Sequence, residues 1–324
     1  MHATPIARRH FLQQSAGAMA AAGILHLGTS AARAAAQPKA SKHAVRLGAP
    51  VFNAPPDPEG LALAHRKLGY RAAYCPGVSL DDKDRIRDTA AAFAKHGVIL
   101  AEVGRWCNLT DLDATKRAAN VATVTEGLAL AEAIGARCCV DIAGSFSRAS
   151  WFGPDPQNFS PRFFDATVEN ARKIIDAVKP TRAKFCYEVM GWSLPDSPDS
   201  YLKMIKAVDR KAFGVHLDPC NLINSPEKFY GITAVLNECF DKLGPWIVSC
   251  HAKDLTWDVE MNVHFREVCI GAGSMDYRTY LCRLAGLAGD VPLMIEHMKD
   301  AAEYDKSRQH LFQVADQIGV RFGQ

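Results

Sequence analysis

The feature that most constrains the fold is an eightfold alternation of short, apolar, β-rich runs with longer amphipathic segments. The expected strands are Ala44–Ala49, Ala72–Cys75, Val98–Val103, Arg137–Ile142, Ala183–Val189, Phe213–Asp218, Trp246–His251 and Pro292–Glu296. The expected helices lie between them, at about 58–68, 81–96, 113–135, 161–178, 198–208, 226–243, 276–288 and 301–317. Eight such units predict the α/β class and a single (β/α)₈ TIM barrel, because a doubly wound sheet needs fewer strands or a second domain.

Several expected helices begin with residues that favour helix N-termini. Ser160, Ser197 and Ser225 each precede a proline, and Asp111 or Asp113 precedes the third helix. Ser and Asp side chains accept hydrogen bonds from the first free N–H groups, and proline is accepted at the first helical position. These residues therefore support the expected helix starts.

The first 36 residues differ in composition from the rest of the chain. Arg8 and Arg9 precede two large apolar residues, an alanine-rich apolar run and a group of small residues. This segment resembles a twin-arginine export signal, which implies contact with the export machinery, removal after Ala34 or Ala36, and a periplasmic location. The predicted domains are thus the signal at 1–36 and one barrel domain at 37–324.

Charge and cysteine usage narrow the function classes. The chain has 38 Lys and Arg against 35 Asp and Glu, and Arg8, Arg9 and Arg33 of the signal account for the whole excess. A neutral mature chain has no general attraction for nucleic acid, so no nucleic-acid partner is expected. The ten cysteines include no CxxC pair and lie largely in apolar runs, which predicts mostly free, buried thiols.

Ionisable residues stand at or beside the ends of six expected strands. They are Glu102, Asp141, Glu188, Asp218, His251 and Glu296. Active sites of such barrels form at the carboxyl ends of the strands. Because unpartnered buried carboxylates are costly, a ring of acids at one barrel mouth predicts a bound cation.

The same residues carry a family resemblance that covers residues 44–320. The motifs are Tyr187-Glu188-Val189-Met190, His216-Leu217-Asp218-Pro219-Cys220-Asn221, His251-Ala252-Lys253-Asp254, Gly271-Ala272-Gly273-Ser274-Met275-Asp276-Tyr277 and Ile295-Glu296-His297. In their order and placement they resemble the sugar phosphate isomerase/epimerase family, the xylose isomerase-like TIM barrels. Many relatives have a histidine where this chain has Asn221.

The resemblance implies one divalent metal ion held by Glu188, Asp218, His251 and Glu296. Three carboxylates and one imidazole suit Mn²⁺, Mg²⁺ or Co²⁺, with Mn²⁺ favoured, and Zn²⁺ would also bind. The resemblance also implies that Glu188 and Glu296 act as catalytic acid and base. The expected substrate contacts are His216, Asn221, Lys253, Arg266, Trp106 and Trp151.

The predicted function is a divalent-metal-dependent isomerase or epimerase of a sugar, keto-sugar or cyclitol. It would abstract a proton next to a carbonyl and pass through a metal-stabilised enediolate. One alternative is a metal-dependent lyase or dehydratase on a keto-sugar or 3-keto-glycoside, and another is a non-catalytic periplasmic sugar-binding protein. Endonucleases with the same barrel use more histidines at the barrel mouth and a basic surface, and this chain has neither, so an endonuclease is not expected.

Family relatives are often dimers or tetramers, so a homodimer or homotetramer is expected.

Overall fold

The computed structural model describes residues 44–323, whose strands form a closed parallel barrel in the order β1-β10-β7-β6-β5-β4-β3-β2. The barrel strands are β1 (Arg46–Gly48), β2 (Ala72–Tyr74), β3 (Ile99–Gly104), β4 (Cys138–Asp141), β5 (Lys184–Glu188), β6 (Phe213–Leu217), β7 (Ile247–Ala252) and β10 (Pro292–Ile295). The predicted signal at 1–36, with its cleavage sites at Ala34 or Ala36, lies outside the described residues.

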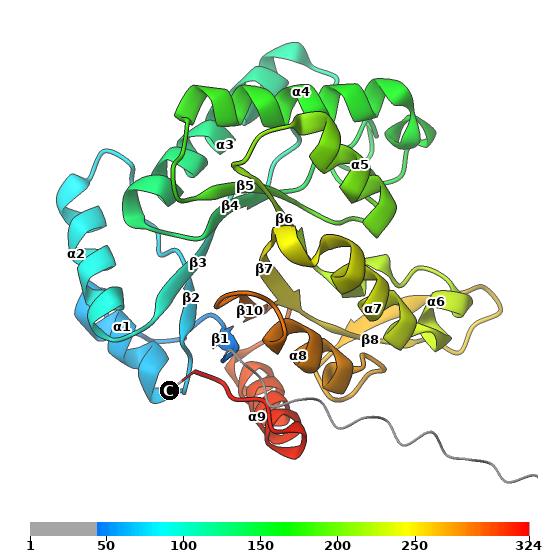
Figure 1. Cartoon of the computed structure of the whole chain (residues 1–324). Coiled ribbons are helices and arrows are strands. Elements are labelled where there is room, and N and C mark those ends of the chain that lie inside the picture. The colour runs from blue at the N-terminus through cyan, green and yellow to red at the C-terminus, as the bar shows by residue number, and fades with distance from the viewer. Residues whose placement is uncertain (1–43, 324) are drawn as a thin grey trace, which may run out of the picture. The chain divides into compact units, whose positions relative to one another are not determined.

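Helices follow the strands and lie outside the barrel (Figure 1). They are α1 (Pro58–Lys67), α2 (Lys83–Lys95), α3 (Ala114–Ile134), α4 (Pro161–Val178), α5 (Pro198–Val208), α6 (Pro226–Tyr230), α7 (Ile232–Leu243), α8 (Tyr277–Ala285) and α9 (Ala301–Ile318). Short 3-10 turns occupy Pro156–Phe159, Pro219–Leu222 and Gly244–Trp246. The predicted single (β/α)₈ barrel is therefore confirmed.

The predicted helix starts are also confirmed, and the choice between Asp111 and Asp113 falls on Asp113. Its carboxylate accepts hydrogen bonds from the backbone N–H groups of Thr115 and Lys116. Ser160, Ser197 and Ser225 cap α4, α5 and α6 in the same way, each with proline in the first turn. The caps fix where each helix leaves its loop.

One predicted helix is interrupted. The segment expected to be helical over 226–243 forms two helices, α6 and α7, on either side of Gly231. At Gly231 the backbone leaves helical geometry (φ −101°, ψ 21°), and a side chain there would lie 2.9 Å from the carbonyl oxygen of Glu227. Glycine thus allows the tight break that amphipathic spacing alone does not reveal.

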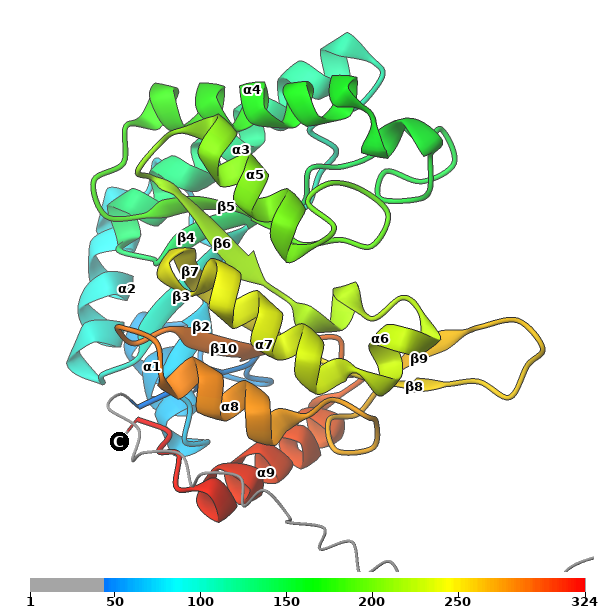
Figure 2. The ribbon, with the colours of Figure 1, turned by 45° about the vertical axis from the view of Figure 1, so that its right-hand side comes forward.

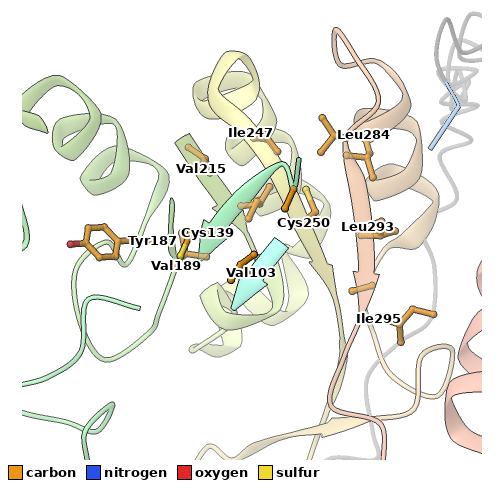
Figure 3. Packing of buried hydrophobic residues seen from close by; sticks show 14 of the residues in the cluster. Val103, Cys139, Tyr187, Val189, Val215, Ile247, Cys250, Leu284, Leu293 and Ile295 are labelled. Atoms are coloured by element: carbon orange, nitrogen blue, oxygen red, sulfur yellow. The ribbon is translucent and has the colours of Figure 1, made fainter. Parts of the chain in front are cut away.

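The hydrophobic core lies between the barrel strands and the helices. Figure 3 shows part of it, with Val103, Cys139, Tyr187, Val215, Leu284 and Leu293 from six different elements in one cluster. All ten cysteines are free, and six of them are buried. Among the described helices, none is long and apolar enough to cross a membrane.

A β-hairpin that the sequence analysis did not predict follows β7. Its antiparallel strands are β8 (Asp254–Trp257) and β9 (Phe265–Val268), and it extends away from the barrel strands (Figure 2). The loop after it is held by Asp254, whose carboxylate accepts hydrogen bonds from the N–H groups of Gly271, Gly273 and Met275. A side chain at Gly273 would lie 2.2 Å from that carboxylate, so this glycine permits close packing of the loop.

Candidate metal centre

Four of the predicted residues meet at the carboxyl ends of the strands. Glu188 ends β5, Asp218 directly follows β6, His251 lies in β7, and Glu296 directly follows β10. One potential ligand atom from each lies within 4.8 Å of those from the other three. The barrel therefore brings together the set proposed from the sequence as metal ligands.

His251 lies between three carboxylates. Its Nδ1 is 2.9 Å from Oε1 of Glu296 and 3.2 Å from Oε1 of Glu188, and its Nε2 is 3.1 Å from Oε1 of Glu102. Burial opposes charge on the ring, but Glu296 and Glu102 outweigh it and raise the pKa of His251 well above its ordinary value. A proton on Nε2 directed at Glu102 leaves Nδ1 facing the other ligands, as metal-binding histidines require.

Glu102 is a residue whose role the sequence analysis missed. The sequence places it among the acids expected at the barrel mouth but assigns it no individual role. Its carboxylate accepts a hydrogen bond from Ser249 Oγ at 3.0 Å and contacts His216 Nδ1 at 3.5 Å. Strands β3 and β7 lie across the barrel from one another, so this contact has no local sequence signal.

Lys253 provides the internal cation of the site. Its Nζ lies 2.8 Å from Oδ2 of Asp218 and 3.4 Å from Oε1 of Glu296, and it donates to Oδ1 of Asn221 at 2.7 Å. Asn221 in turn donates to Oε1 of Glu188 at 3.2 Å. The Asn221 amide therefore connects the lysine to a glutamate of the cluster.

The four-residue cluster fits a divalent cation. Oδ2 of Asp218 and Oε1 of Glu296 are buried and make no hydrogen bond of good geometry, although Lys253 and His251 lie at ion-pair distance. Burial raises the pKa of Asp218 to about 7 despite the nearby Lys253. Such a carboxylate gains a strong partner when a cation binds. Three carboxylates and one imidazole are a suitable donor set for a hard or borderline ion.

A cavity of about 730 Å³ opens onto this cluster. Trp106, Trp151, Asn221 and Lys253, all predicted substrate contacts, line it together with both catalytic candidates, Glu188 and Glu296. Trp106 and Trp151 are partly exposed, so their rings are available to a ligand. The cavity also contains Glu267, which comes from the unpredicted hairpin. Apolar and polar residues alternate over 261–265, which ends at the first residue of that strand, and this short run is the signal that could have revealed it.

Two predicted substrate contacts lie elsewhere. His216 is fully buried against His251, with ring centroids 4.1 Å apart, and it lines neither the first cavity nor a second one of about 700 Å³. Arg266 lines this second cavity and pairs with Asp258, with 2.6 Å between Nε and Oδ1.

Asp141 has a structural role outside the cluster. Its buried carboxylate accepts hydrogen bonds from the N–H groups of Cys107 and Ile142, at 3.1 and 2.8 Å. Burial raises the pKa of Asp141 well above its ordinary value. Because Cys107 follows Trp106, this carboxylate fixes the loop that presents Trp106 to the first cavity.

Solved structures of several enzyme types share this fold. The chain is similar to a magnesium-bound xylose isomerase-like TIM barrel protein from Mycobacterium smegmatis (18% identity, TM-score 0.60, covering 87% of this chain and 100% of that one). It is also similar to D-psicose 3-epimerase from Clostridium cellulolyticum H10, solved with D-tagatose (14%, TM-score 0.60, 85% and 100%). A third similar structure is endonuclease IV from Thermus thermophilus (14%, TM-score 0.63, 84% and 99%).

The similarity to these solved structures, at 14–18% sequence identity, shows the fold. The family is shown by a match of the sequence to a family model. The comparison of the sequence with curated proteins gives no significant match. The family model described as "Xylose isomerase-like TIM barrel" matches residues 62–314, which is most of the chain. The chain therefore belongs to the xylose isomerase-like TIM barrel family.

Proposed function

We propose that this protein is a divalent-metal-dependent isomerase or epimerase of an uncharged sugar, keto-sugar or cyclitol. The observation that carries the proposal is that Glu188 and Glu296, which both line the first cavity, converge on one nitrogen, Nδ1 of His251. The two glutamates come from β5 and β10, which are separated by β6 and β7 around the barrel. The two carboxylates can thus contact a bound substrate from different sides.

Glu188 and Glu296 would perform the proton transfers. One carboxylate takes a proton from carbon next to the substrate carbonyl. Return of a proton to the opposite face of the same carbon by the other glutamate gives an epimer. Return of the proton to the former carbonyl carbon by the same glutamate, with transfer of the neighbouring hydroxyl proton to the former carbonyl oxygen, gives an isomer. A bound divalent cation would polarise the carbonyl and lower the cost of the negative charge that develops on its oxygen.

The remaining residues would bind and orient the substrate. Lys253 offers a buried ammonium group beside the carboxylates, and Asn221 holds it in place. Trp106 and Trp151 offer aromatic faces to the carbon-bound hydrogens of a sugar ring. Four glutamates line the first cavity, namely Glu102, Glu188, Glu267 and Glu296. Their charge favours an uncharged substrate over a phosphorylated one or DNA.

The metal is proposed as Mn²⁺, with Mg²⁺, Co²⁺ and Zn²⁺ as the other ions that the donor set accepts.

The second candidate function is that of a lyase or dehydratase. It would begin with the same proton abstraction and then expel a group from the adjacent carbon. The observation that favours this second candidate is the space beyond Asn221 and Glu267, where a second cavity could receive the expelled group.

The direct test combines metal analysis with solvent deuterium exchange. The purified protein is expected to contain a divalent metal and to transfer deuterium from D₂O into a substrate among free sugars, keto-sugars and cyclitols. Glu188→Gln and Glu296→Gln should each abolish the exchange, whereas Glu260→Gln, on the exposed hairpin loop, should keep it. Sugar binding that survives Glu188→Gln, with no exchange in the unmodified protein, would instead indicate the non-catalytic binding protein. A protein that takes up no metal would refute the proposal.

A further inference from the structure

Two cavities of similar size meet beside the metal centre. The first, of about 730 Å³, contains the carboxylate cluster, and the second, of about 700 Å³, extends from it under the hairpin. Met190, Asn221 and Glu267 line both, so they form the wall between the cavities. Small-molecule sites typically occupy about 300–1,000 Å³, so each cavity alone could hold a ligand the size of one sugar ring.

Trp192 provides an exposed aromatic residue in the lining of the second cavity. The residue is 54% exposed, and its backbone carbonyl is held by a buried side chain. The carbonyl oxygen of Trp192 accepts a 2.9 Å hydrogen bond from Nδ2 of the fully buried Asn158. The same Asn158 amide is also bonded to Ser145 and Gly153. Because the backbone of Trp192 is held, a ligand that stacks on the indole has to order only the side-chain torsions of this residue.

The hairpin side of the second cavity is also held in place. Phe265 stacks on Phe229, with ring centroids 5.1 Å apart and an interplanar angle of 13°. The neighbouring Arg266 is held by Asp258 through the 2.6 Å ion pair. Aromatic faces combined with a few fixed polar groups are the usual lining of a carbohydrate-sized site.

The charges of the second cavity match an uncharged ligand. Its lining includes one cation, Arg266, and one carboxylate, Glu267, along with the neutral amides of Asn221 and Asn224. Because Arg266 is already paired, the cavity offers no surplus positive charge to a phosphate. Hydroxyl groups, by contrast, find both donors and acceptors there.

We propose that the second cavity binds a second sugar ring, so that the substrate is a disaccharide-sized keto-sugar glycoside whose reacting ring occupies the first cavity. This inference rests on the proposed function for the position of the reacting ring. Trp192 stacks on the second ring, and the wall of Met190, Asn221 and Glu267 lies along the glycosidic bond. The chain therefore discriminates between a free ketose and the same ketose carrying a glycosyl group.

The experiment compares D-fructose with the glucosyl-fructoses trehalulose, turanose, maltulose, leucrose and palatinose, which carry the added glucose at different positions. Calorimetry on the metal-loaded protein gives a Kd for each sugar, and deuterium exchange from D₂O is followed for the same panel. At least one disaccharide should bind about tenfold or more tightly than fructose. Trp192→Ala should reduce that ratio to near one. Trp246→Ala, which removes a partly exposed tryptophan before β7 at the opposite end of the barrel, should keep the ratio.

The outcomes separate this inference from the proposed function. Exchange into fructose without tighter binding of any disaccharide would overturn the second subsite while supporting the proton-transfer function. A disaccharide preference that depends on Trp192, without exchange into any sugar, would support the subsite and contradict the proposed catalysis. The subsite would be overturned if the ratio of the Kd for fructose to the Kd for the disaccharide were the same in Trp192→Ala and in the unmodified protein. It would also be overturned if no sugar of the panel bound.

Discussion

Among single residues, Glu102 has the least obvious and most testable role. It does not belong to the four-residue cluster, yet its Oε1 lies 3.1 Å from Nε2 of His251, which comes from the opposite side of the barrel. Carboxylates that orient a metal-binding histidine typically account for 10- to 100-fold in metal affinity. We therefore assign Glu102 as a positioning residue for His251.

Glu102→Gln should weaken Mn²⁺ binding by roughly 10- to 100-fold, because the amide cannot stabilise the imidazole with a full negative charge. Calorimetric titration of the metal-free protein measures the effect, and circular dichroism shows whether the variant is folded. Ser249→Ala, which removes one hydrogen bond to Glu102 and leaves its carboxylate in place, should cost less affinity. Unchanged Mn²⁺ affinity in a folded Glu102→Gln protein would contradict the assignment.

The contrast between these residues shows what sequence reasoning can reach at this scale. Strand ends and the barrel topology placed Glu188, Asp218, His251 and Glu296 at one mouth together with Glu102 and Asp141, and only the family resemblance singled out those four as expected metal ligands. The partner of His251 was not predictable, since the choice between Glu102 and Asp141 depends on side-chain directions across the barrel. Asp141 turns instead to two backbone N–H groups.

At the scale of elements, the connection from α4 to β5 depends on one side chain of α3. Glu132 accepts hydrogen bonds from the N–H groups of Thr181, Arg182 and Ala183, and from the Thr181 hydroxyl at 2.6 Å. Partial burial alone would raise the pKa of Glu132, but the Thr181 hydroxyl and these N–H donors lower it to about 2. The ionised carboxylate therefore anchors the start of the strand that carries Glu188.

Glu132→Ala should lower the free energy of unfolding at pH 7 by about 1–3 kcal/mol, since several backbone donors lose their acceptor. A depressed folded-state pKa contributes stability that is present above the unfolded pKa of about 4.5 and is lost as pH falls towards about 2. The difference from the unmodified protein should therefore shrink over that range. Urea unfolding at several pH values measures it. Glu126→Ala, at an exposed position of the same helix, should have little effect, and an equal loss there would contradict the anchoring role.

Elements differed in how well the sequence predicted them. The strands and most helices were predicted because apolar periodicity and N-terminal caps agree at each unit. The β8–β9 hairpin was missed because each strand is only four residues long, and in β9 the two polar residues Arg266 and Glu267 are adjacent, so apolar and polar residues do not alternate there. The break at Gly231 was missed because the apolar spacing continues across it.

For the whole molecule, a cation at the cluster should stabilise the folded chain. A ligand that binds only the folded state, present at 100 times its Kd, adds about 2.7 kcal/mol. For a chain of this size we expect Mn²⁺ to raise the melting temperature by roughly 5–10 °C, and EDTA to reverse the rise. Differential scanning calorimetry measures it. Asp218→Asn should remove most of the Mn²⁺ effect, and a full Mn²⁺ shift in that variant would argue against the cluster as the site.

The proposed export also concerns the whole chain. We propose that the protein is carried folded to the periplasm through Arg8 and Arg9, a proposal supported by the sequence of residues 1–36. Replacing both arginines with lysine should leave the protein in the cytoplasm with its signal attached. Cell fractionation with mass measurement of the N-terminus tests this. Processed periplasmic protein from the doubly substituted chain would contradict the twin-arginine route.

The hairpin has a consequence for how this protein could diversify. Its strands supply Phe265, Arg266 and Glu267 to the two cavities, but they pair only with each other and take no part in closing the barrel. Changes in its length or composition would therefore alter ligand choice while the eight-stranded scaffold and its ionisable cluster stay intact. Selection can therefore change the hairpin independently of the barrel, and grafting another hairpin in its place is a route to a protein with a different ligand preference.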